Sequence, residues 1–420
     1  MHPEFVSARE ACAILDIAPA TLYAYVSRGL LESRPGPDHR SRVYSRQDLQ
    51  RLARRKRAGR GAAGGAAQSL DRGLPVLETR ISLIQPDGPY YRGRSAVTAV
   101  RDGATLEDAA RLLWDCGAED PFAAPPAERW PARVAAIARD AALPPLERAM
   151  AAIPLLALDV RHSFNSATSV RREIAALLLR QNAALLVAER PSPHPIHALL
   201  ARCWKSRDAA FADLVRAALV LCADHELNVS AFAARVVAST GAHLHATACS
   251  GLAALSGPRH GGATARAYAL IEDALPSPSP SALVASRWRR GDDLPGFRHA
   301  LYPDGDPRAA ELLRMLREAR GRNRTMRRID GLVRCAEDIS GQRPNIDFTL
   351  AAICHVHALP ATPALVLFAA GRLAGWLAHA LEQQADGRLI RPRARYEGDR
   401  PERTGGRKSH PRPDSAAAVD

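Results

Sequence analysis

The stretch Gly257-Pro-Arg-His260-Gly-Gly-Ala263 decides how the rest of the chain is interpreted, because it sets a histidine between a proline and two glycines. Two more histidine-centred segments accompany it. Ala223-Asp-His225-Glu-Leu-Asn228 precedes it, and Gly296-Phe-Arg-His299-Ala-Leu-Tyr302 follows it. One such histidine in a helical protein is most simply a hydrogen-bonded structural residue. Three of them in order indicate a set with a shared chemical purpose.

Composition predicts an almost all-α protein. Of the 420 residues 47% are apolar and only 5% are aromatic. This apolar content is rich in Ala and Leu, which favours helices packed on helices over sheets. From residue 105 onward, helix-like stretches such as 106–115, 147–159 and 166–188 are separated by Pro and Gly. A chain of this length is expected to form two or three structural units.

Cysteine usage and hydropathy predict a cytoplasmic protein without a membrane segment. The seven cysteines include no CxxC pair, so neither a disulfide framework nor a metal site is expected. No run of eighteen apolar residues appears, and the first residues lack the basic and apolar regions of a secretory signal. The cysteines are residues 12, 116, 203, 222, 249, 335 and 354.

The first sixty residues carry the pattern of a small helical module. Ser7 and Glu10 have the spacing of a capping box, which predicts a helix start. Pro19 and Gly29 suit the beginning and the end of a second short helix over 20–28. The basic, turn-rich stretch 34–42 fits a hairpin wing, and a third helix is expected over 45–57.

This front region resembles the winged helix-turn-helix of the MerR and excisionase type over residues 5–57. It holds twelve Lys or Arg against six Asp or Glu in residues 1–60, within a chain of net charge +14. The resemblance implies a DNA-binding surface, whereas the alternative is an interaction or dimerisation module with solvated arginines. The residues it would place near DNA are Thr21, Tyr23 and Arg28 of the second helix and the wing residues Arg40 and Arg42.

Composition also divides the chain. Residues 58–72 are rich in Gly and Ala without apolar periodicity and are expected to be a flexible linker. A second, larger part opens at residue 73. The Pro-, Gly- and charge-rich tail 397–420 is expected to be disordered.

The three histidine segments belong to a longer ordered series that resembles the citrate synthase family over residues 73–396. The resemblance implies an all-α, two-domain fold with the active site in the cleft and a homodimeric assembly. The large domain would comprise 73–256 and 349–396, and the small domain 257–348. The other members of the series are Glu78-Thr-Arg-Ile-Ser82, Tyr91-Arg-Gly93, Ser239-Thr-Gly241, Gly305-Asp-Pro-Arg308, Pro344-Asn-Ile-Asp347, Gly371-Arg372 and Arg391-Pro-Arg393.

The resemblance implies condensation of acetyl-CoA with oxaloacetate, with acetyl-CoA as a substrate and no cofactor. Such an enzyme must remove a methyl proton beside a thioester, which needs a base and a group that stabilises the charge on the carbonyl oxygen. The resemblance assigns these roles to Asp347 and a neutral His260. Gly261 and Gly262 would let the backbone pass close to the substrate.

The resemblance also implies the residues that hold oxaloacetate. Planar guanidinium groups suit its two carboxylates because each offers paired donors. His299 would protonate the ketone oxygen, and His225 would help hold the substrate. Arg393, the second arginine of its segment, is a weaker candidate than the first. The arginines that match the carboxylate-binding positions of the family are Arg308, Arg372 and Arg391.

Some residues differ from the usual sequence pattern of the family. Arg298 and Ala300 flank His299 where Gly and Arg are more familiar, and Val229 replaces the commoner Ala. The CoA nucleotide is not assigned to residues, although the basic stretch 286–290 is a candidate. Two alternative functions stay open. One is a 2-methylcitrate synthase that uses propionyl-CoA, and the other is a metabolite-sensing DNA-binding regulator.

Overall fold

The structure is a computed structural model, and it divides the chain into two compact units. Met1–Glu78 with Arg391–Asp420 form the first unit, and Thr79–Ile390 form the second. Each unit is described by itself. The residues that the structure describes are 5–15, 22, 26, 31, 33–35, 42–46, 49, 77–127, 129–160, 167–205, 208–277, 279–393, 396 and 398.

The first unit contains a helix and a small antiparallel sheet. Helix α1 (Ala8–Leu15) follows β1 (Phe5–Ser7), and β3 (Arg42–Ser45) lies between β1 and β2 (Ser33–Pro35). The predicted capping box is confirmed, since Glu10 Oε2 accepts the Ser7 N–H at 3.0 Å and Ser7 Oγ accepts the Glu10 N–H at 3.3 Å. The β2–β3 pair confirms the predicted hairpin, while β1 was not predicted. This unit has its own core of Val6, Ala11, Leu15, Leu22, Leu31, Tyr44 and Leu49.

The second unit opens with a three-stranded antiparallel sheet and is otherwise helical. The sheet has the order β4 (Ser82–Gln85), β5 (Gly88–Tyr91) and β6 (Arg94–Ser95). Its helices are α5 (Ala96–Arg101), α6 (Leu106–Leu113), α7 (Ala132–Arg139), α8 (Pro145–Leu156), the 3₁₀ turn η1 (Ala157–Asp159), α9 (Thr168–Leu186), α10 (Ile196–Lys205), α11 (Ala209–Cys222), α12 (Val229–Ala238), α13 (Leu244–Leu255), α14 (Gly262–Ala274), α15 (Pro280–Arg289), α16 (Pro307–Arg320), α17 (Arg324–Ser340), α18 (Ile346–Val356) and α19 (Thr362–Asp386).

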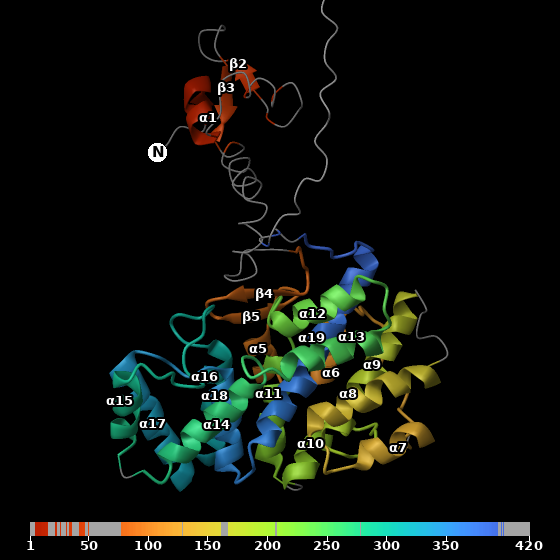
Figure 1. Cartoon of the computed structure of the whole chain (residues 1–420), viewed down its shortest axis with the longest axis vertical. Helices are drawn as coiled ribbons and strands as arrows, with labels where there is room; N and C mark the ends of the chain where they lie inside the picture. Colours follow the sequence, from red (N-terminus) through yellow and green to blue (C-terminus); the bar gives the residue numbers. More distant parts are fainter. Residues whose placement is uncertain are drawn as a thin grey trace, which may run out of the picture. The chain divides into compact units, whose positions relative to one another are not determined.

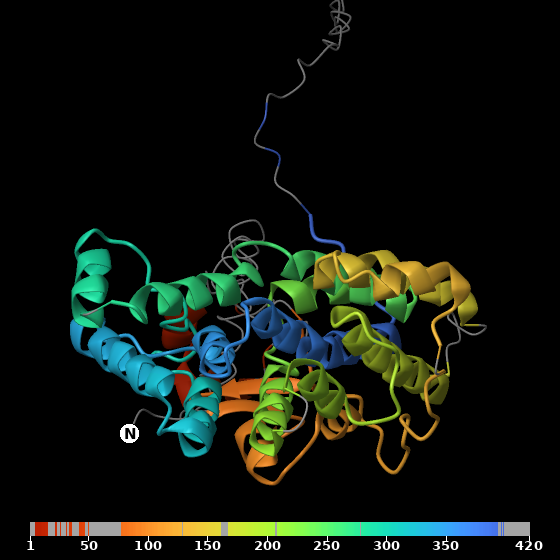
Figure 2. The same cartoon turned by 90° about the horizontal axis from the view of Figure 1, so that it is seen from below.

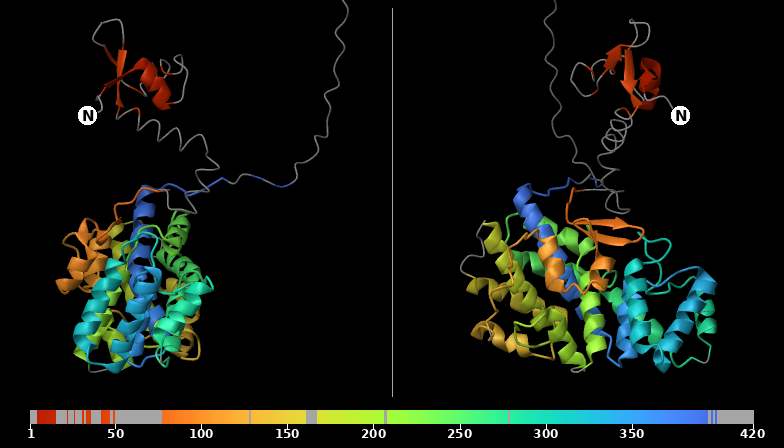
Figure 3. Two further views of the ribbon diagram at one scale, coloured as in Figure 1. Left: turned by 90° about the vertical axis from the view of Figure 1, so that its left-hand side faces the viewer. Right: turned by 180° about the vertical axis from the view of Figure 1, so that it is seen from behind.

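The helices of this unit gather in two groups beside α19. Helices α14 to α18 lie together on one side, and α7 to α10 lie on the other (Figures 1 and 2). Helix α18 packs against α14 and α16 and also contacts α19, so it joins the two groups. The view from behind keeps this division (Figure 3). The predicted boundary between a large and a small domain, at 257 and 348, remains a prediction.

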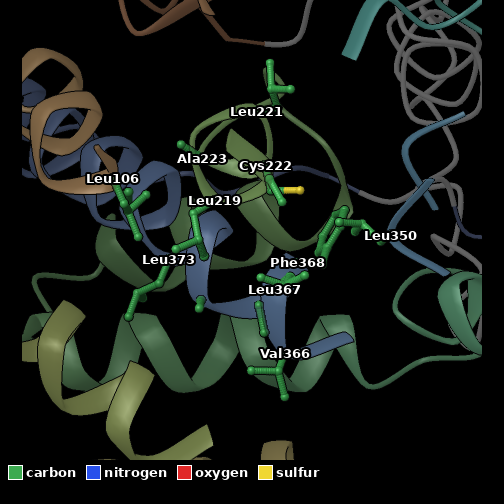
Figure 4. Packing of buried hydrophobic residues seen from close by; sticks show 14 of the residues in the cluster. Leu106, Leu219, Leu221, Cys222, Ala223, Leu350, Val366, Leu367, Phe368 and Leu373 are labelled. Atoms are coloured by element: carbon green, nitrogen blue, oxygen red, sulfur yellow. The ribbon is translucent and has the colours of Figure 1, made fainter. Parts of the chain in front are cut away.

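The core is built around α11 and α19, which pack against each other. Their buried side chains include Leu219 and Cys222 on α11 and Leu367 and Phe368 on α19 (Figure 4). Gly371 allows this close approach, because a Cβ there would lie 2.7 Å from the Leu219 carbonyl oxygen. Among the described residues, α19 is the one helix long and apolar enough to cross a membrane, but 89% of its apolar window is buried inside the fold.

Side-chain caps fix where the helices that carry site residues begin. The Asn228 side chain accepts the Ala231 N–H at the start of α12. Asp306 caps α16, whose first residue is Pro307, and Asn345 caps α18 through the N–H groups of Asp347 and Phe348. These caps place Arg308 and Asp347 in the first turns of their helices.

Candidate active site

The candidate site residues come from five segments of the second unit. His225 follows α11, and His260 lies in the turn before α14. His299 lies in the loop that leads to α16, whose first turn carries Arg308. The first turn of α18 carries Asp347, and the middle of α19 carries Arg372.

Two of the three predicted histidines lie side by side. The ring centroids of His225 and His299 are 5.1 Å apart. The Tyr302 hydroxyl lies 3.0 Å from His225 Nε2, and its ring centroid is 4.9 Å from that of His299. His299 Nδ1 accepts the Leu301 N–H at 3.2 Å, so the neutral ring carries its proton on Nε2. His299 is therefore set as a donor through that nitrogen.

His260 is held by a different set of residues, Ser230 and its neighbours. Its Nε2 lies 2.8 Å from Ser230 Oγ, which accepts the Trp376 indole N–H at 3.0 Å. Ser230 Oγ donates to Asn228 Oδ1 at 2.8 Å, and its one proton can go to only one of these two neighbours. When it donates to Nε2, the neutral His260 ring carries its proton on Nδ1. The rings of His260 and Phe368 meet edge to face at 5.7 Å.

All three histidines are biased toward the neutral form. Burial lowers the pKa of His260 to about 4, and Arg372 acts in the same direction. Burial followed by Arg308 lowers the pKa of His299 to about 4 as well. Burial, followed by Arg308 and Arg372, holds the pKa of His225 well below its usual value. Neutral imidazoles can act as hydrogen-bond donors beside developing negative charge.

Two buried arginines place positive charge near the three histidines. Arg308 is 2% exposed and binds Asp306 through Nε at 3.0 Å and Nη2 at 2.8 Å. Arg372 is 1% exposed, and its Nε donates to the Cys222 carbonyl at 2.7 Å. Its two Nη groups have no hydrogen-bond partner among the described residues, and burial lowers the pKa of Arg372. An arginine in this state is prepared for an anionic ligand.

Asp347 is the candidate base, and it lines a cavity of about 640 Å³. Burial raises the pKa of Asp347 to about 6, against the opposing effects of Arg308 and Arg372. A carboxylate with a pKa in this range can accept a proton at neutral pH and release it again. Because Arg372 influences the pKa values of both Asp347 and His260, the two residues share its neighbourhood.

A buried network supports the loop that carries His225. Asp224 is fully buried and binds Ser82 Oγ on β4, and its Oδ1 is 3.4 Å from His379 Nε2 on α19. The next residue, Glu226, has a left-handed φ of 56°. Its N–H donates to Ser82 Oγ and to Asp224 Oδ2, both at 3.0 Å. Burial raises the pKa of Asp224, but His379 and Arg372 outweigh this effect and hold that pKa below its usual value.

Sequence reasoning missed several residues of this site. Ser230 holds His260, Tyr302 contacts His225, and Asp306 binds Arg308. All three lie within or directly beside the quoted motifs, so their proximity to the histidines and to Arg308 was the available signal. Gly261 also meets a packing constraint inside the chain, because a Cβ there would lie 2.3 Å from the Leu255 carbonyl oxygen. Its predicted closeness to the substrate remains a prediction.

The remaining predicted residues belong to other segments of the chain. Arg391 and Arg393 are exposed, and both belong to the first unit. In the basic stretch 286–290, Arg287 pairs with Asp273 and Arg290 pairs with Asp292. Arg42 is exposed and donates to Ser33 Oγ at 2.9 Å. The other predicted DNA contacts, Thr21, Tyr23, Arg28 and Arg40, lie outside the described residues, as do the linker 58–72 and most of the tail 397–420.

The part of the chain that the structure describes contains no cluster of three or more His, Cys, Asp or Glu side chains that could hold a metal ion.

A sequence model for the C-terminal domain of citrate synthase matches residues 69–393. The chain belongs to the citrate synthase family. A helix-turn-helix domain model matches residues 5–57, which confirms the front module.

Known members of the citrate synthase family resemble part of this chain. Citrate synthase of Haloferax volcanii is 38% identical over 187 residues, which cover 44% of this chain and 49% of that protein. The 2-methylcitrate synthase of Shewanella oneidensis is 34% identical over 203 residues, or 47% of this chain and 53% of that protein. The matched stretches thus span about half the length of these curated relatives.

A solved structure confirms the predicted fold. Citrate synthase of Thermoplasma acidophilum, in a ternary complex with carboxymethyl coenzyme A and oxaloacetate, superposes with a TM-score of 0.66 at 23% identity. The superposition covers 81% of this chain and 98% of that one. The all-α citrate synthase fold preceded by a helix-turn-helix module is therefore established.

Proposed function

We propose that this member of the family is a citrate synthase that condenses acetyl-CoA with oxaloacetate and water to give citrate and CoA. The observation that carries the proposal is the buried Arg372, whose Nη groups have no protein partner among the described residues, beside neutral histidines and a carboxyl with a pKa of about 6. Arg308 adds a second guanidinium, of which Asp306 binds Nε and Nη2, while Nη1 has no hydrogen-bond partner in the described part of the chain. Such a site suits a small dianion that must be attacked by a carbon nucleophile.

In the first step, Asp347 takes a proton from the methyl carbon of acetyl-CoA. His260 donates a hydrogen bond from Nδ1 to the thioester oxygen, where negative charge develops. Ser230 is the positioning residue for this donor: when its hydroxyl proton turns from Asn228 Oδ1 to His260 Nε2, that nitrogen becomes an acceptor and the ring proton stays on Nδ1. The product is an enolate with a nucleophilic methylene carbon.

In the second step, this carbon attacks the ketone carbon of oxaloacetate, whose carboxylates bind Arg308 and Arg372. His225 helps hold the substrate, and His299 Nε2 delivers a proton to the ketone oxygen. The bound dianion offsets the arginine charges that lower the pKa of His299, so that pKa rises toward its usual value on binding. Water then hydrolyses the thioester, which releases CoA and citrate.

The assembly and cellular setting form part of the same proposal. We expect a homodimer in which Arg391 of each subunit reaches the active site of its partner. We also expect a cytoplasmic enzyme at the entrance of the tricarboxylic acid cycle, with no cofactor and no metal. Closure of the large domain over the small one would exclude water before condensation.

Thiol release with oxaloacetate tests the function. We expect acetyl-CoA to give a higher kcat/KM than propionyl-CoA, the substrate of the alternative 2-methylcitrate synthase. One methylene separates the two thioesters by only about 1–3 kcal/mol, so both must be measured. Because Asp347 acts as a base only when ionised, kcat/KM should fall about tenfold per pH unit below pH 6. Preference for propionyl-CoA would select the alternative, and no thiol release from either would reject both.

The front module favours one further function, DNA binding by a metabolite-sensing regulator. Its helix-turn-helix match and the exposed Arg42 support that possibility. Because this module has its own core, we expect deletion of residues 1–72 to leave condensation intact. Selection from random duplex DNA at physiological salt tests the regulator directly. Enrichment of a two-fold symmetric sequence, lost when Arg40 and Arg42 are changed to Ala, would establish DNA recognition as a function of the chain.

A further inference from the structure

Arg298 has a backbone conformation that suits glycine. Its φ is 65°, in the left-handed region that residues with a Cβ rarely adopt. Two hydrogen bonds hold it there: its N–H donates to the Arg343 carbonyl at 2.8 Å, and its carbonyl accepts Asn345 Nδ2 at 3.0 Å. An arginine at such a position indicates that the side chain has a use, because glycine would relieve the strain.

The two hydrogen bonds also fix Arg298 relative to the candidate base. Asn345 caps α18 and accepts the Asp347 N–H at 3.0 Å through Oδ1, while its amide nitrogen holds the Arg298 carbonyl. Asn345 N–H in turn donates to the Gly296 carbonyl at 2.8 Å. The segment that carries Arg298 and the helix that carries Asp347 are therefore tied together at one residue.

Arg298 and Asp347 line the same cavity of about 640 Å³, together with Arg266 on α14 and Trp288 on α15. This volume is large enough for part of a substrate of the size of a CoA thioester. The cavity wall is tightly packed at Gly296, where a Cβ would lie 2.8 Å from the Phe348 side chain. Its wall therefore combines the base with two cationic side chains and an aromatic ring.

The charges of this wall are unevenly paired. Within the described part of the chain, Arg266 and Arg298 form no ion pair, and the side chain of Arg298 is exposed. Of the carboxylates on the wall, Asp292 is bound by Arg290, and Asp347 is the candidate base. Asp293, five residues before Arg298, is the remaining carboxylate. The arginines of the nearby basic stretch, Arg287 and Arg290, are already engaged by aspartates.

We propose that Arg298, assisted by Arg266, binds an oxyanion of the thioester substrate and so acts as a specificity-determining residue of the acyl-CoA cavity. This inference rests on the proposed condensing activity. Two sources of the oxyanion share this chemistry: a phosphate of CoA, and a carboxylate at the far end of a dicarboxylic acyl group. A guanidinium offers both of them a planar pair of donors.

The test compares Arg298→Gly with the wild-type chain. Glycine suits the left-handed backbone, so the variant removes the cation without disturbing the fold, and its Tm should be equal or higher. Arg298→Ala removes the same cation but keeps the strain, and Arg334→Ala removes an exposed arginine of α17 that does not line the cavity. Binding of CoA is measured by calorimetry, and kcat/KM by thiol release from acetyl-CoA, succinyl-CoA and an acetyl thioester without phosphates.

If the oxyanion is a phosphate, Arg298→Gly and Arg298→Ala weaken CoA binding about tenfold, as expected for the loss of a charge-assisted hydrogen bond. The thioester without phosphates is then unaffected. If the oxyanion is an acyl carboxylate, CoA binding is unchanged and kcat/KM falls about tenfold for succinyl-CoA alone. Arg334→Ala has no effect in either case.

Three results would overturn the inference. The first is CoA binding and kcat/KM within twofold of wild type for every thioester. The second is an equal loss for the thioester without phosphates, which would mean that Arg298 acts on Asp347 through the backbone. The third is no CoA binding to the wild-type chain. Absence of thiol release alone would reject the proposed function, while CoA binding to the wild type and Arg298→Gly would still test Arg298.

Discussion

Replacing Asp347 by alanine is expected to lower kcat for condensation by about 10²–10⁴-fold, the usual contribution of a positioned base. Oxaloacetate binding should stay within about threefold of wild type, because Asp347 acts on the other substrate. Removal of this carboxylate also relieves repulsion of the dianion at Arg308 and Arg372, which are close enough to influence the Asp347 pKa. Thiol release gives kcat, and calorimetry gives the oxaloacetate affinity.

Asp338→Ala is the matched control, since Asp338 is an exposed carboxylate of α17 outside the cavity. It should retain wild-type kcat. Loss of oxaloacetate binding together with activity in Asp347→Ala would contradict the assignment of Asp347 to the thioester. A kcat within threefold of wild type would show that another group removes the proton.

Arg372→Lys is expected to weaken oxaloacetate binding by about 10- to 100-fold while the KM for acetyl-CoA changes little. Lysine keeps the charge but replaces the two-donor fork with a single ammonium group, and it also loses the Nε hydrogen bond to the Cys222 carbonyl. Calorimetry with oxaloacetate measures the change. A thermal unfolding scan is needed beside it, because the side chain is buried.

Arg317→Lys serves as the control, because Arg317 is an exposed arginine of α16 paired with Asp330. It should bind oxaloacetate as the wild type does. If Arg372→Lys folds normally and its oxaloacetate affinity stays within a factor of about two, Arg372 does not bind a substrate carboxylate.

The sequence predicted interactions between residues that are close in the chain, and residues that belong to a recognisable motif. The capping box of Ser7 and Glu10 needs only a spacing of three residues, and the structure contains it. The network around Asp224 was not predictable in this way. Ser82 and Asp224 are 142 residues apart, and neither side chain signals the other in the sequence.

The electrostatic state of the site also needed the structure. His260 and His299 are ordinary histidines in sequence, and only their burial near Arg372 and Arg308 lowers their pKa values to about 4. The same holds for Arg298. The sequence shows only that this residue differs from the family pattern, whereas the structure shows that its backbone is left-handed and that it lines the same cavity as Asp347. Motif order selects the candidate residues, while their burial and backbone conformation come from the structure.

The hydrogen bonds of Ser82 set a limit on how this chain can be recombined with other modules. Ser82 is the first residue of β4, and its hydroxyl holds both the Asp224 carboxylate and the Glu226 N–H on either side of His225. A recombination point upstream of residue 79 leaves the second unit whole. One placed only four residues later would exchange Ser82, and with it the support of the loop that carries His225, along with the front module. In this chain, an exchange of the front module that keeps the His225 loop intact must therefore end before Ser82.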